Sequence, residues 1–305
     1  MPTEVIRHGR IRWTNITRAT RDDVEALQAE YPQFHPLDLE DLLSRIERPK
    51  IDEYDDYLFT VMHFPLWDSV EKLSRASEVD TFIGSNYVVT IHDGVLSPLA
   101  NLFERCQDDE AERANFMGQG PSHLFHTVVD HLVDYIFPIL YKVDANIRGL
   151  EEEIFTSNFK AVIQNLALIR RDNIALRRIV RPQLEILEIL ERTEHHVIRD
   201  ELDVYFGDIR DHLNKATDLI SDHKEVIEGL VDTTNTLAAH RTNQIVQILT
   251  VISVIMLPLT LISGIYGMNV DLPLHNDPRA FVVIIILMIF VASIMLFVFK
   301  ERNWL

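Results

Sequence analysis

The sequence of 305 residues has a single cysteine and ten glycines, and what it lacks excludes several classes of protein. Cys106 alone cannot form an intrachain disulfide or a thiolate metal site, which agrees with a reducing compartment. The glycines are scattered, so no glycine-rich phosphate loop of the ATPase kind is present. No His-Glu-x-x-His motif and no nucleophile elbow occurs either. The sequence therefore argues against an enzyme and against an ATP-driven pump.

The charge of the chain is strongly acidic, with a formal net charge of −18. The first 240 residues carry 25 Lys and Arg against 44 Asp and Glu. A region this acidic repels nucleic acid and anionic lipid headgroups and attracts cations. Many domains are acidic for solubility alone, so the charge favours a cation-binding function without deciding it.

Two long apolar runs near the C-terminus are the feature on which the other predictions depend. The first, Ile245–Asn269, includes about 20 consecutive residues without a charge, which is the length needed to cross the roughly 30 Å hydrocarbon core of a bilayer. The second run covers Phe281–Phe299. We expect transmembrane helix 1 over residues 245–269, an external loop over 270–280, transmembrane helix 2 over 281–299 and a cytoplasmic tail over 300–305.

Basic residues flank the outer ends of this predicted hairpin. His240 and Arg241 precede the first run, and Lys300 and Arg302 follow the second. Cytoplasmic flanks carry an excess of Lys and Arg, so we expect a two-span protein of the cell (inner) membrane with both termini in the cytoplasm.

The first 200 residues are expected to form two cytosolic parts. Residues 1–121 combine strand-like alternation, as in Tyr57–Phe64, with helical spacing, as in Thr20–Tyr31, which predicts an α/β cytosolic domain. The polar and glycine-containing stretch Gln107–Pro121 predicts a loop at its end. Residues 122–200 predict antiparallel cytosolic helices.

A single long helix is predicted from about Glu201 to Tyr266. Apolar residues recur at helical spacing through this stretch, and no proline interrupts it before Pro258. Residues 201–244 would form a cytosolic stalk that continues directly into the first span, about 65 residues in all. A helix this long requires partners, so we expect an oligomer.

One face of this long helix has an unusual composition. It combines an acid, an amide, apolar side chains, hydroxyls and small residues at steps of three, four and seven. Repeated around a symmetry axis, the hydroxyls and amides would form rings that suit a hydrated cation, and the apolar zone would close by dewetting. The alternative is a helix-packing face, which small residues also favour. The stripe consists of Asp232, Ala239, Asn243, Val246, Leu249, Ser253, Leu257, Thr260 and Gly264.

The end of the first span carries the motif Tyr-Gly-Met-Asn at residues 266–269. Placed before a short loop and a second span, this motif closely resembles that of the CorA family of divalent cation channels. The segments His35-Pro36-Leu37, Arg48-Pro49-Lys50 and Tyr205–His212 are also similar, so the resemblance covers nearly the whole chain. It implies a funnel-shaped homopentamer with an α/β N-terminal cytosolic domain, a long helical stalk and a two-helix transmembrane hairpin. It also implies passive Mg²⁺ uptake, with Co²⁺ and Ni²⁺ as further ions.

The resemblance assigns roles to particular residues. It implies a selectivity filter at Gly267, Met268 and Asn269, where a ring of amide oxygens holds a hydrated ion. It places the pore lining and gate on the stripe described above, with Asp232 at the inner mouth. It implies regulatory Mg²⁺ between neighbouring subunits, because facing carboxylates repel without an ion and are clamped by one. The regulatory residues are Glu40, Asp41, Asp208 and His212.

The sequence departs from the family pattern after the filter. Magnesium-selective members usually carry Met-Pro-Glu-Leu there, whereas this chain has Val270–Leu274 without the glutamate. Asp271 and Asp277 keep the external loop acidic, which still concentrates cations. The preference among Mg²⁺, Co²⁺, Ni²⁺ and Zn²⁺ stays open, and a ZntB-like zinc transporter coupled to protons is the alternative.

Two further interpretations fit parts of the sequence. A membrane-anchored sensing protein would bind ions and pass none, but an anchor needs no hydroxyls and amides along its span. His123, His126 and Asp130 share one helical face, a possible zinc set. Without a cysteine partner or a zinc motif, we interpret these side chains as structural.

Overall fold

A computed structural model describes residues 3–44, 47–155, 159–268, 270, 273, 279–302 and 304. The chain divides into two compact units, Met1–Leu230 and Val231–Leu305, and each is described by itself. The strands are β1 (Thr3–His8), β2 (Ile11–Thr17), β3 (Lys50–Glu53), β4 (Tyr57–Asp68), β5 (Leu73–Gly84) and β6 (Tyr87–His92). The helices are α1 (Arg21–Glu30), α2 (Pro36–Asp41), α3 (Ser97–Asp108), α4 (Glu110–Met117), α5 (Pro121–Asp134), α6 (Ile136–Glu153), α7 (Phe159–Val180), α8 (Gln183–Arg192), η1 (Asp200–Leu202, a 3₁₀ turn), α9 (Asp203–Tyr266) and α10 (Ala280–Glu301).

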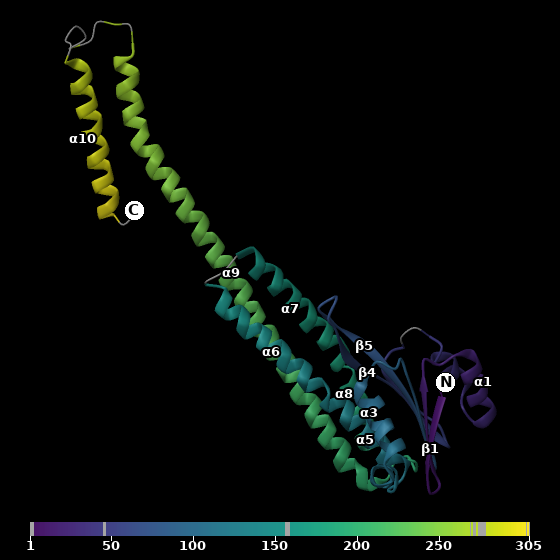
Figure 1. The fold of residues 1–305 in the computed structure, drawn as a ribbon. Helices are drawn as coiled ribbons and strands as arrows, with labels where there is room; N and C mark the ends of the chain where they lie inside the picture. The colour runs from purple at the N-terminus through teal and green to yellow at the C-terminus, as the bar shows by residue number, and fades with distance from the viewer. Residues whose placement is uncertain are drawn as a thin grey trace. The chain divides into compact units, whose positions relative to one another are not determined.

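The strands form a mixed sheet in the order β1-β2-β6-β5-β4-β3, with β2 and β6 parallel and the other neighbours antiparallel. Residues along β4 and β6 are buried on both faces of the sheet, as the consecutive Tyr57, Leu58 and Phe59 show. Such a sheet needs a layer on each side. Figure 1 shows α1 on one side of the sheet and α3, α5 and α8 on the other.

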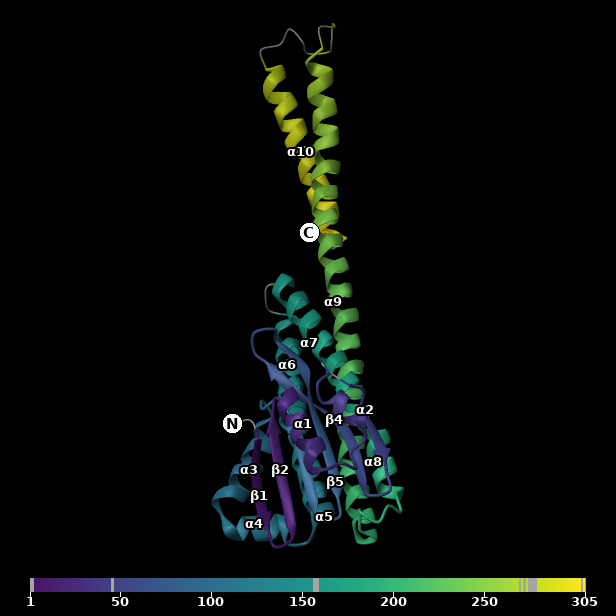
Figure 2. The same ribbon diagram turned by 90° about the vertical axis from the view of Figure 1, so that its right-hand side faces the viewer.

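The smaller layer consists of α1 and α2. In Figure 2, α1 lies in front of the strands. Thr20 begins α1 with a capping box to Asp23, and the His35 ring accepts a hydrogen bond from the backbone of Leu37 at the start of α2. Leu27 and Leu39 bury their side chains against the sheet. These local signals explain why α1 begins at Arg21 and α2 at Pro36.

The larger layer contains α3 and α5–α8, together with the first part of α9. Within the first unit, the buried residues of α9 alternate at three- and four-residue steps, which gives the helix one apolar seam. This seam consists of Phe206, Ile209, Leu213, Ala216, Ile220 and Ile227.

The two long C-terminal helices agree with the prediction, whereas parts of the N-terminal region differ from it. The long helix ends at Tyr266 as predicted, and α10 covers the second apolar run. The loop predicted over Gln107–Pro121 is wrong, because α4 occupies Glu110–Met117. Its polar start and glycine end are the N-cap at Asp109 and the C-cap at Gly118 rather than a linker. β4 is also longer than the predicted strand-like stretch Tyr57–Phe64, because it continues to Asp68.

In the second unit, both helices expose apolar side chains almost along their whole length. α9 and α10 each contain a stretch long and apolar enough to cross a membrane. The side-chain amide of Gln247 donates a hydrogen bond to the backbone carbonyl of Trp304 at 3.1 Å, which satisfies the polar group at the start of the first apolar run. Exposed apolar helices of this length are stable in lipid rather than in water.

Candidate ion pathway and cation-binding cluster

Of the two acids predicted on α2, Asp41 pairs with a lysine of β3. Lys50 Nζ lies 2.7 Å from Asp41 Oδ2 and 2.7 Å from Asp52 Oδ2. Burial acts to lower the pKa of Lys50, but the hydrogen bonds to the two carboxylates outweigh it and raise the pKa above its ordinary value. Glu40 is exposed to solvent. A divalent cation that binds Asp41 must therefore compete with the Lys50 ammonium for the same carboxylate.

A buried carboxyl fixes α2 in place beneath these acids. Asp38 is 1% exposed and accepts hydrogen bonds from the hydroxyls of Tyr54 at 2.9 Å and Tyr57 at 2.8 Å. Burial raises the pKa of Asp38, and the two tyrosine hydroxyls act against this shift. Each carboxylate oxygen of Asp38 accepts a hydrogen bond from one tyrosine. Asp38 therefore anchors the helix that carries Glu40 and Asp41.

A second cluster joins α5 to α9. Asp130, Asp134 and His212 each offer one ligand atom, and these atoms all lie within 4.8 Å of one another. Asp130 and Asp134 are one turn apart on α5, and His212 Nδ1 lies 3.8 Å from Asp134 Oδ1 without a hydrogen-bond partner in the described part of the chain. Asp208 precedes His212 by one turn of α9 and is exposed. The structure therefore brings the predicted residues Asp208 and His212 to a face lined by further acids.

The electrostatics of this cluster favour a cation. Burial raises the pKa of Asp130, and the negative charge of Asp134 raises it further. Burial also lowers the pKa of the adjacent His126, so its imidazole is held neutral. Two carboxylates and an imidazole suit Co²⁺, Ni²⁺ or Zn²⁺ directly, and they suit Mg²⁺ through its bound waters.

The two predicted halves of the regulatory site belong to different layers. Leu39 of α2 belongs to the same core cluster as Leu27 of α1, whereas α5 packs on the side of the sheet opposite α1 (Figure 1). Within one chain, Asp41 and Asp208 thus belong to separate surfaces. Residues on two separate surfaces can meet around one ion only when copies of the chain assemble.

Replacing Asp130 with asparagine should stabilise the metal-free protein and remove much of its response to divalent cations. The neutral amide ends the repulsion with Asp134, whose effect is visible in the raised pKa of Asp130. For the unchanged protein, a cation at about 100 times its Kd stabilises the folded state by about 2.7 kcal/mol, a shift of a few degrees in Tm. Thermal unfolding with EDTA and with Mg²⁺ or Co²⁺ measures both effects. Asp218 is an exposed acid on α9, so Asp218→Asn is the control. A full response to Mg²⁺ and Co²⁺ in Asp130→Asn would contradict the cluster assignment.

The predicted stripe lies along α9 and is exposed at each of its site positions. Leu249 is 59% exposed and Leu257 is 70% exposed. The Ser253 hydroxyl donates to the carbonyl of Leu249 at 2.8 Å, and the Thr260 hydroxyl donates to the carbonyl of Met256 at 2.8 Å. Each hydroxyl has used its single proton inside the helix, so its lone pairs remain free to accept from a water molecule or to face a cation.

The outer part of the stripe lines a shallow open groove of about 680 Å³ on α9. Ser253, Leu257, Thr260 and Gly264 belong to it, and Met268 lies at its end. Asp232 and Asn243 are exposed on the same helix nearer the first unit. A helix face that lines a pore between several copies would show such a groove and such polar positions in a single chain, where no neighbouring copy covers them.

The predicted filter is described only in part. α9 ends at Tyr266, and the backbone N–H of Gly267 donates to the carbonyl of Ser263 at 2.9 Å. A Cβ added at Gly267 would meet that oxygen at 3.0 Å, so a glycine fits this close approach of the backbone. Asn269, Asp271 and Asp277 lie outside the described residues.

Two residues of these sites were missed by sequence reasoning. Asp134 could have been found, because it follows Asp130 by four residues on the same helical face. Lys50 was noticed only as part of a motif, and its pairing with Asp41 depends on the fold of β3 against α2.

Comparison with known proteins gives a consistent result over the whole chain. The model of the family described as "CorA-like Mg2+ transporter protein" matches residues 8–301. The protein YfjQ of Bacillus subtilis is 31% identical over 306 residues, covering 100% of this chain and 93% of YfjQ. The cobalt/magnesium transport protein CorA of Thermotoga maritima is 30% identical over 294 residues, covering 96% of this chain and 83% of that protein. The solved structure of the CorA magnesium transporter from Methanocaldococcus jannaschii has a TM-score of 0.85 at 21% identity, covering 98% of this chain and 93% of that one.

Proposed function

Because this chain belongs to the CorA-like Mg²⁺ transporter family, we propose that it is a passive channel through which divalent cations, chiefly Mg²⁺, enter the cell. Members of this family are metal ion transporters rather than enzymes. The proposal adds that five copies assemble around one axis, that α9 lines the path, and that Co²⁺ and Ni²⁺ also pass. Both termini lie on the cytoplasmic side of the inner membrane, as the basic flanks of the two spans favour.

The observation that carries the proposal is the polar stripe inside an otherwise apolar helix. The hydroxyls of Ser253 and Thr260 have donated their protons to the helix, so they present only acceptors outward. A lipid-facing surface gains nothing from such acceptors, whereas a hydrated cation is stabilised by them. Asn243 and Asp232 continue the same chemistry toward the cytosol. Val246 and Leu249 form the narrow apolar zone that closes the path by dewetting.

The outer mouth selects the ion while it keeps its water. Mg²⁺ loses its first-shell waters reluctantly and prefers octahedral oxygen, so a ring of Asn269 amide oxygens can hold the hydrated ion. Gly267 and Met268 lead into this ring from the C-terminal end of α9. The C-terminus of a helix carries a partial negative charge, which adds to the attraction. Asp271 and Asp277 raise the cation concentration outside the filter.

Internal Mg²⁺ closes the channel by joining adjacent copies. Glu40 and Asp41 of one copy face Asp208 and His212 of the next, with Asp130 and Asp134 completing the second surface. Without an ion these acids repel, and the copies separate. Lys50 competes for Asp41, so the closing concentration depends on how readily Mg²⁺ displaces this ammonium.

The test is ion flux into liposomes that contain the purified protein, measured one ion at a time with and without a pH gradient. Mg²⁺ and Co²⁺ should flow down their own gradients at a rate that a pH gradient leaves unchanged. Zn²⁺ influx that needs a proton gradient would replace the proposal with a ZntB-like transporter. The absence of flux for Mg²⁺, Co²⁺, Ni²⁺ and Zn²⁺ would leave a membrane-anchored sensing protein.

A further inference from the structure

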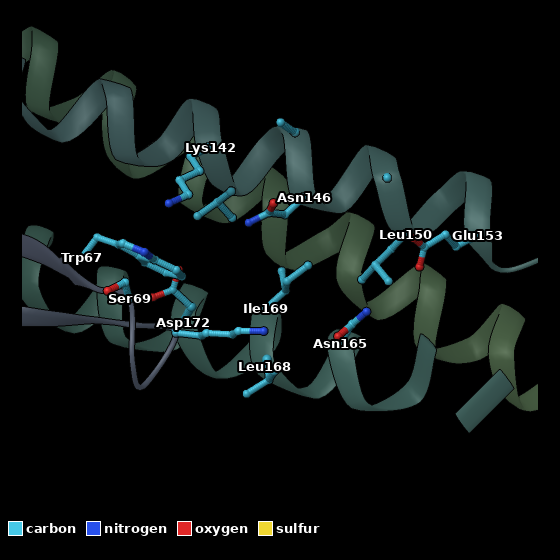
Figure 3. A pocket seen from close by; sticks show the side chains of 14 residues that line it. Trp67, Ser69, Lys142, Asn146, Leu150, Glu153, Asn165, Leu168, Ile169 and Asp172 are labelled. Carbon is cyan, nitrogen blue, oxygen red and sulfur yellow. The ribbon is translucent and has the colours of Figure 1, made fainter. Parts of the chain in front are cut away.

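A cavity of about 510 Å³ opens between α6, α7 and the turn that joins β4 to β5. This volume lies within the range of about 300–1,000 Å³ that is typical of small-molecule sites. Figure 3 shows its arrangement: Trp67, Ser69 and Asp172 lie at one end, Asn146 and Asn165 in the middle, and Glu153 at the other end. Neither the ion path on α9 nor the cation cluster on α5 includes a residue of this cavity.

The first sign of a function is Gly149, a glycine inside α6 about one turn before its C-terminal end. The stripe of α6 that lines the cavity is Lys142, Asn146, Gly149 and Glu153, at steps of four, three and four residues. A glycine inside a helix destabilises it by roughly 0.5–1 kcal/mol relative to alanine. A Cβ added at Gly149 would meet nothing within 4 Å, so neither the backbone nor a neighbour requires a glycine there. Gly149 therefore lines open space, which a side chain larger than that of alanine would fill.

The second sign is a lysine in a left-handed turn. Lys72 has φ +50°, a conformation in which glycine is favoured and a long side chain is strained. The turn itself is already defined by Asp68, whose carboxylate accepts hydrogen bonds from the backbone of Val70 and Glu71. Lys72 is therefore unnecessary for the turn, and its side chain lines the cavity. Two locally unfavourable residues thus border one cavity, and such conflicts concentrate at functional sites.

The polar groups of the cavity differ along its length: ammonium groups lie toward one end, and amide groups with a carboxylate lie toward the other. Lys142 Nζ lies 4.5 Å from the centre of the Trp67 ring, and this cation–π contact holds the ammonium beside β4. Lys72, which also lines the cavity, belongs to the turn that follows β4. Asp172 is 3% exposed, and its carboxylate accepts a hydrogen bond from the backbone of Ser74 at 2.6 Å. Burial raises the pKa of Asp172, and the lysines Lys72 and Lys142 outnumber this one carboxylate among the lining residues. This end of the cavity suits a phosphate.

The middle and far end suit a base. Asn146 and Asn165 extend their amides into the space between α6 and α7 (Figure 3). An amide offers a donor and an acceptor side by side, the pattern that pairs with the edge of a purine. The Glu153 carboxylate can accept from an exocyclic amine, and Leu150 and Ile169 supply apolar walls for a flat ring.

We propose that this cavity binds a nucleoside phosphate, with the phosphate on Lys72 and Lys142 and the base between Asn146 and Asn165. The proposal is independent of the ion path, since it rests on α6, α7 and the β4–β5 turn alone.

Calorimetric titration of the full-length protein in detergent tests this assignment. EDTA is present throughout, so no metal can bridge a nucleotide to the acidic clusters. AMP, ADP and ATP are the probes, with adenosine, ribose 5-phosphate and inorganic phosphate as fragments. At least one nucleotide should bind with Kd below about 1 mM, and each fragment should bind at least about tenfold more weakly, since each lacks either the base or the phosphate contacts.

Two variants remove the site without weakening the fold. Gly149→Leu fills the cavity with a better helix former, and Lys72→Gly removes an ammonium while relieving the left-handed strain. Both should weaken nucleotide binding at least about tenfold while Tm stays equal or rises. Gly149→Ala leaves the cavity open and should bind as the unchanged protein does. Arg18 is another cationic residue with positive φ, +57°, so Arg18→Gly is the matched control for Lys72→Gly.

The outcomes separate clearly. Nucleotide binding that is lost in Gly149→Leu and Lys72→Gly and kept in both controls supports the assignment. No nucleotide binding below about 1 mM would overturn it, as would unchanged binding in the two variants. Inorganic phosphate that binds as tightly as AMP would also overturn it, because the base would then contribute nothing.

Discussion

Replacing Asn269 with alanine should lower Mg²⁺ influx into liposomes at least about tenfold, since a hydrogen bond to a charged group is worth about 1.5–3 kcal/mol. The amide oxygens of a pore-mouth ring hold the waters of the hydrated ion, and a methyl group cannot replace them. The remaining flux should also discriminate poorly between Mg²⁺ and other divalent cations. Initial rates from an internal fluorescent indicator, taken for Mg²⁺ and Co²⁺ separately, measure both effects.

Val270→Ala is the control for this experiment, because it makes a similar truncation one residue beyond the motif. It should conduct and select as the unchanged protein does. If Asn269→Ala conducts Mg²⁺ at the normal rate with normal selectivity, the residue is not part of the filter, and the assignment of Gly267 and Met268 fails with it.

Replacing Asp41 or Asp208 with lysine should keep the channel open when internal Mg²⁺ is high. Each change removes a carboxylate from the proposed site between copies and adds an ammonium that repels the ion. The concentration of internal Mg²⁺ that halves the influx should rise at least about tenfold, because a differential affinity of that size shifts the closed population accordingly. Liposomes loaded with graded Mg²⁺ and assayed for Co²⁺ influx give this concentration directly.

Asp52 supplies a matched control for the sensor variants. Its carboxylate contacts the same lysine as Asp41, at the same distance of 2.7 Å, yet it is not among the proposed regulatory residues. Asp52→Asn should close at a Mg²⁺ concentration near the normal one, with any small change upward because Lys50 then pairs with Asp41 alone. Normal closure in both Asp41→Lys and Asp208→Lys would show that the ion that closes the channel binds elsewhere.

The elements that sequence predicted well are those whose signal is local. α9 and α10 follow from helical periodicity and from unbroken apolar composition, which no distant contact needs to supply. α4 was missed because a short helix between a capping aspartate and a glycine has the composition of a loop. The parallel pairing of β2 with β6 joins residues such as Thr14 and Val89, and nothing near either residue announces it.

The same distinction holds for the sites. The stripe on α9 was predictable because its members share one helix and one period. The cluster on α5 and α9 was half predicted: His212 came from the family resemblance, whereas Asp130 was assigned a structural role and Asp134 was overlooked. The pairing of Lys50 with Asp41 and the cavity between α6 and α7 depend on tertiary packing, so their residues carry no shared sequence signal.

The central claim is that copies of α9 enclose a watery path along the stripe from Asp232 to Gly264. Cysteine accessibility tests it most directly, and Cys106→Ser supplies a cysteine-free background because the chain has one cysteine. Asn243→Cys and Thr260→Cys lie on the stripe, whereas Ile262→Cys lies on the opposite side of the helix. The account predicts that Ag⁺, a small thiol-reactive cation, lowers Mg²⁺ influx at least about tenfold in both stripe variants and leaves Ile262→Cys unaffected. Block of Ile262→Cys with unchanged influx through Asn243→Cys and Thr260→Cys would contradict it.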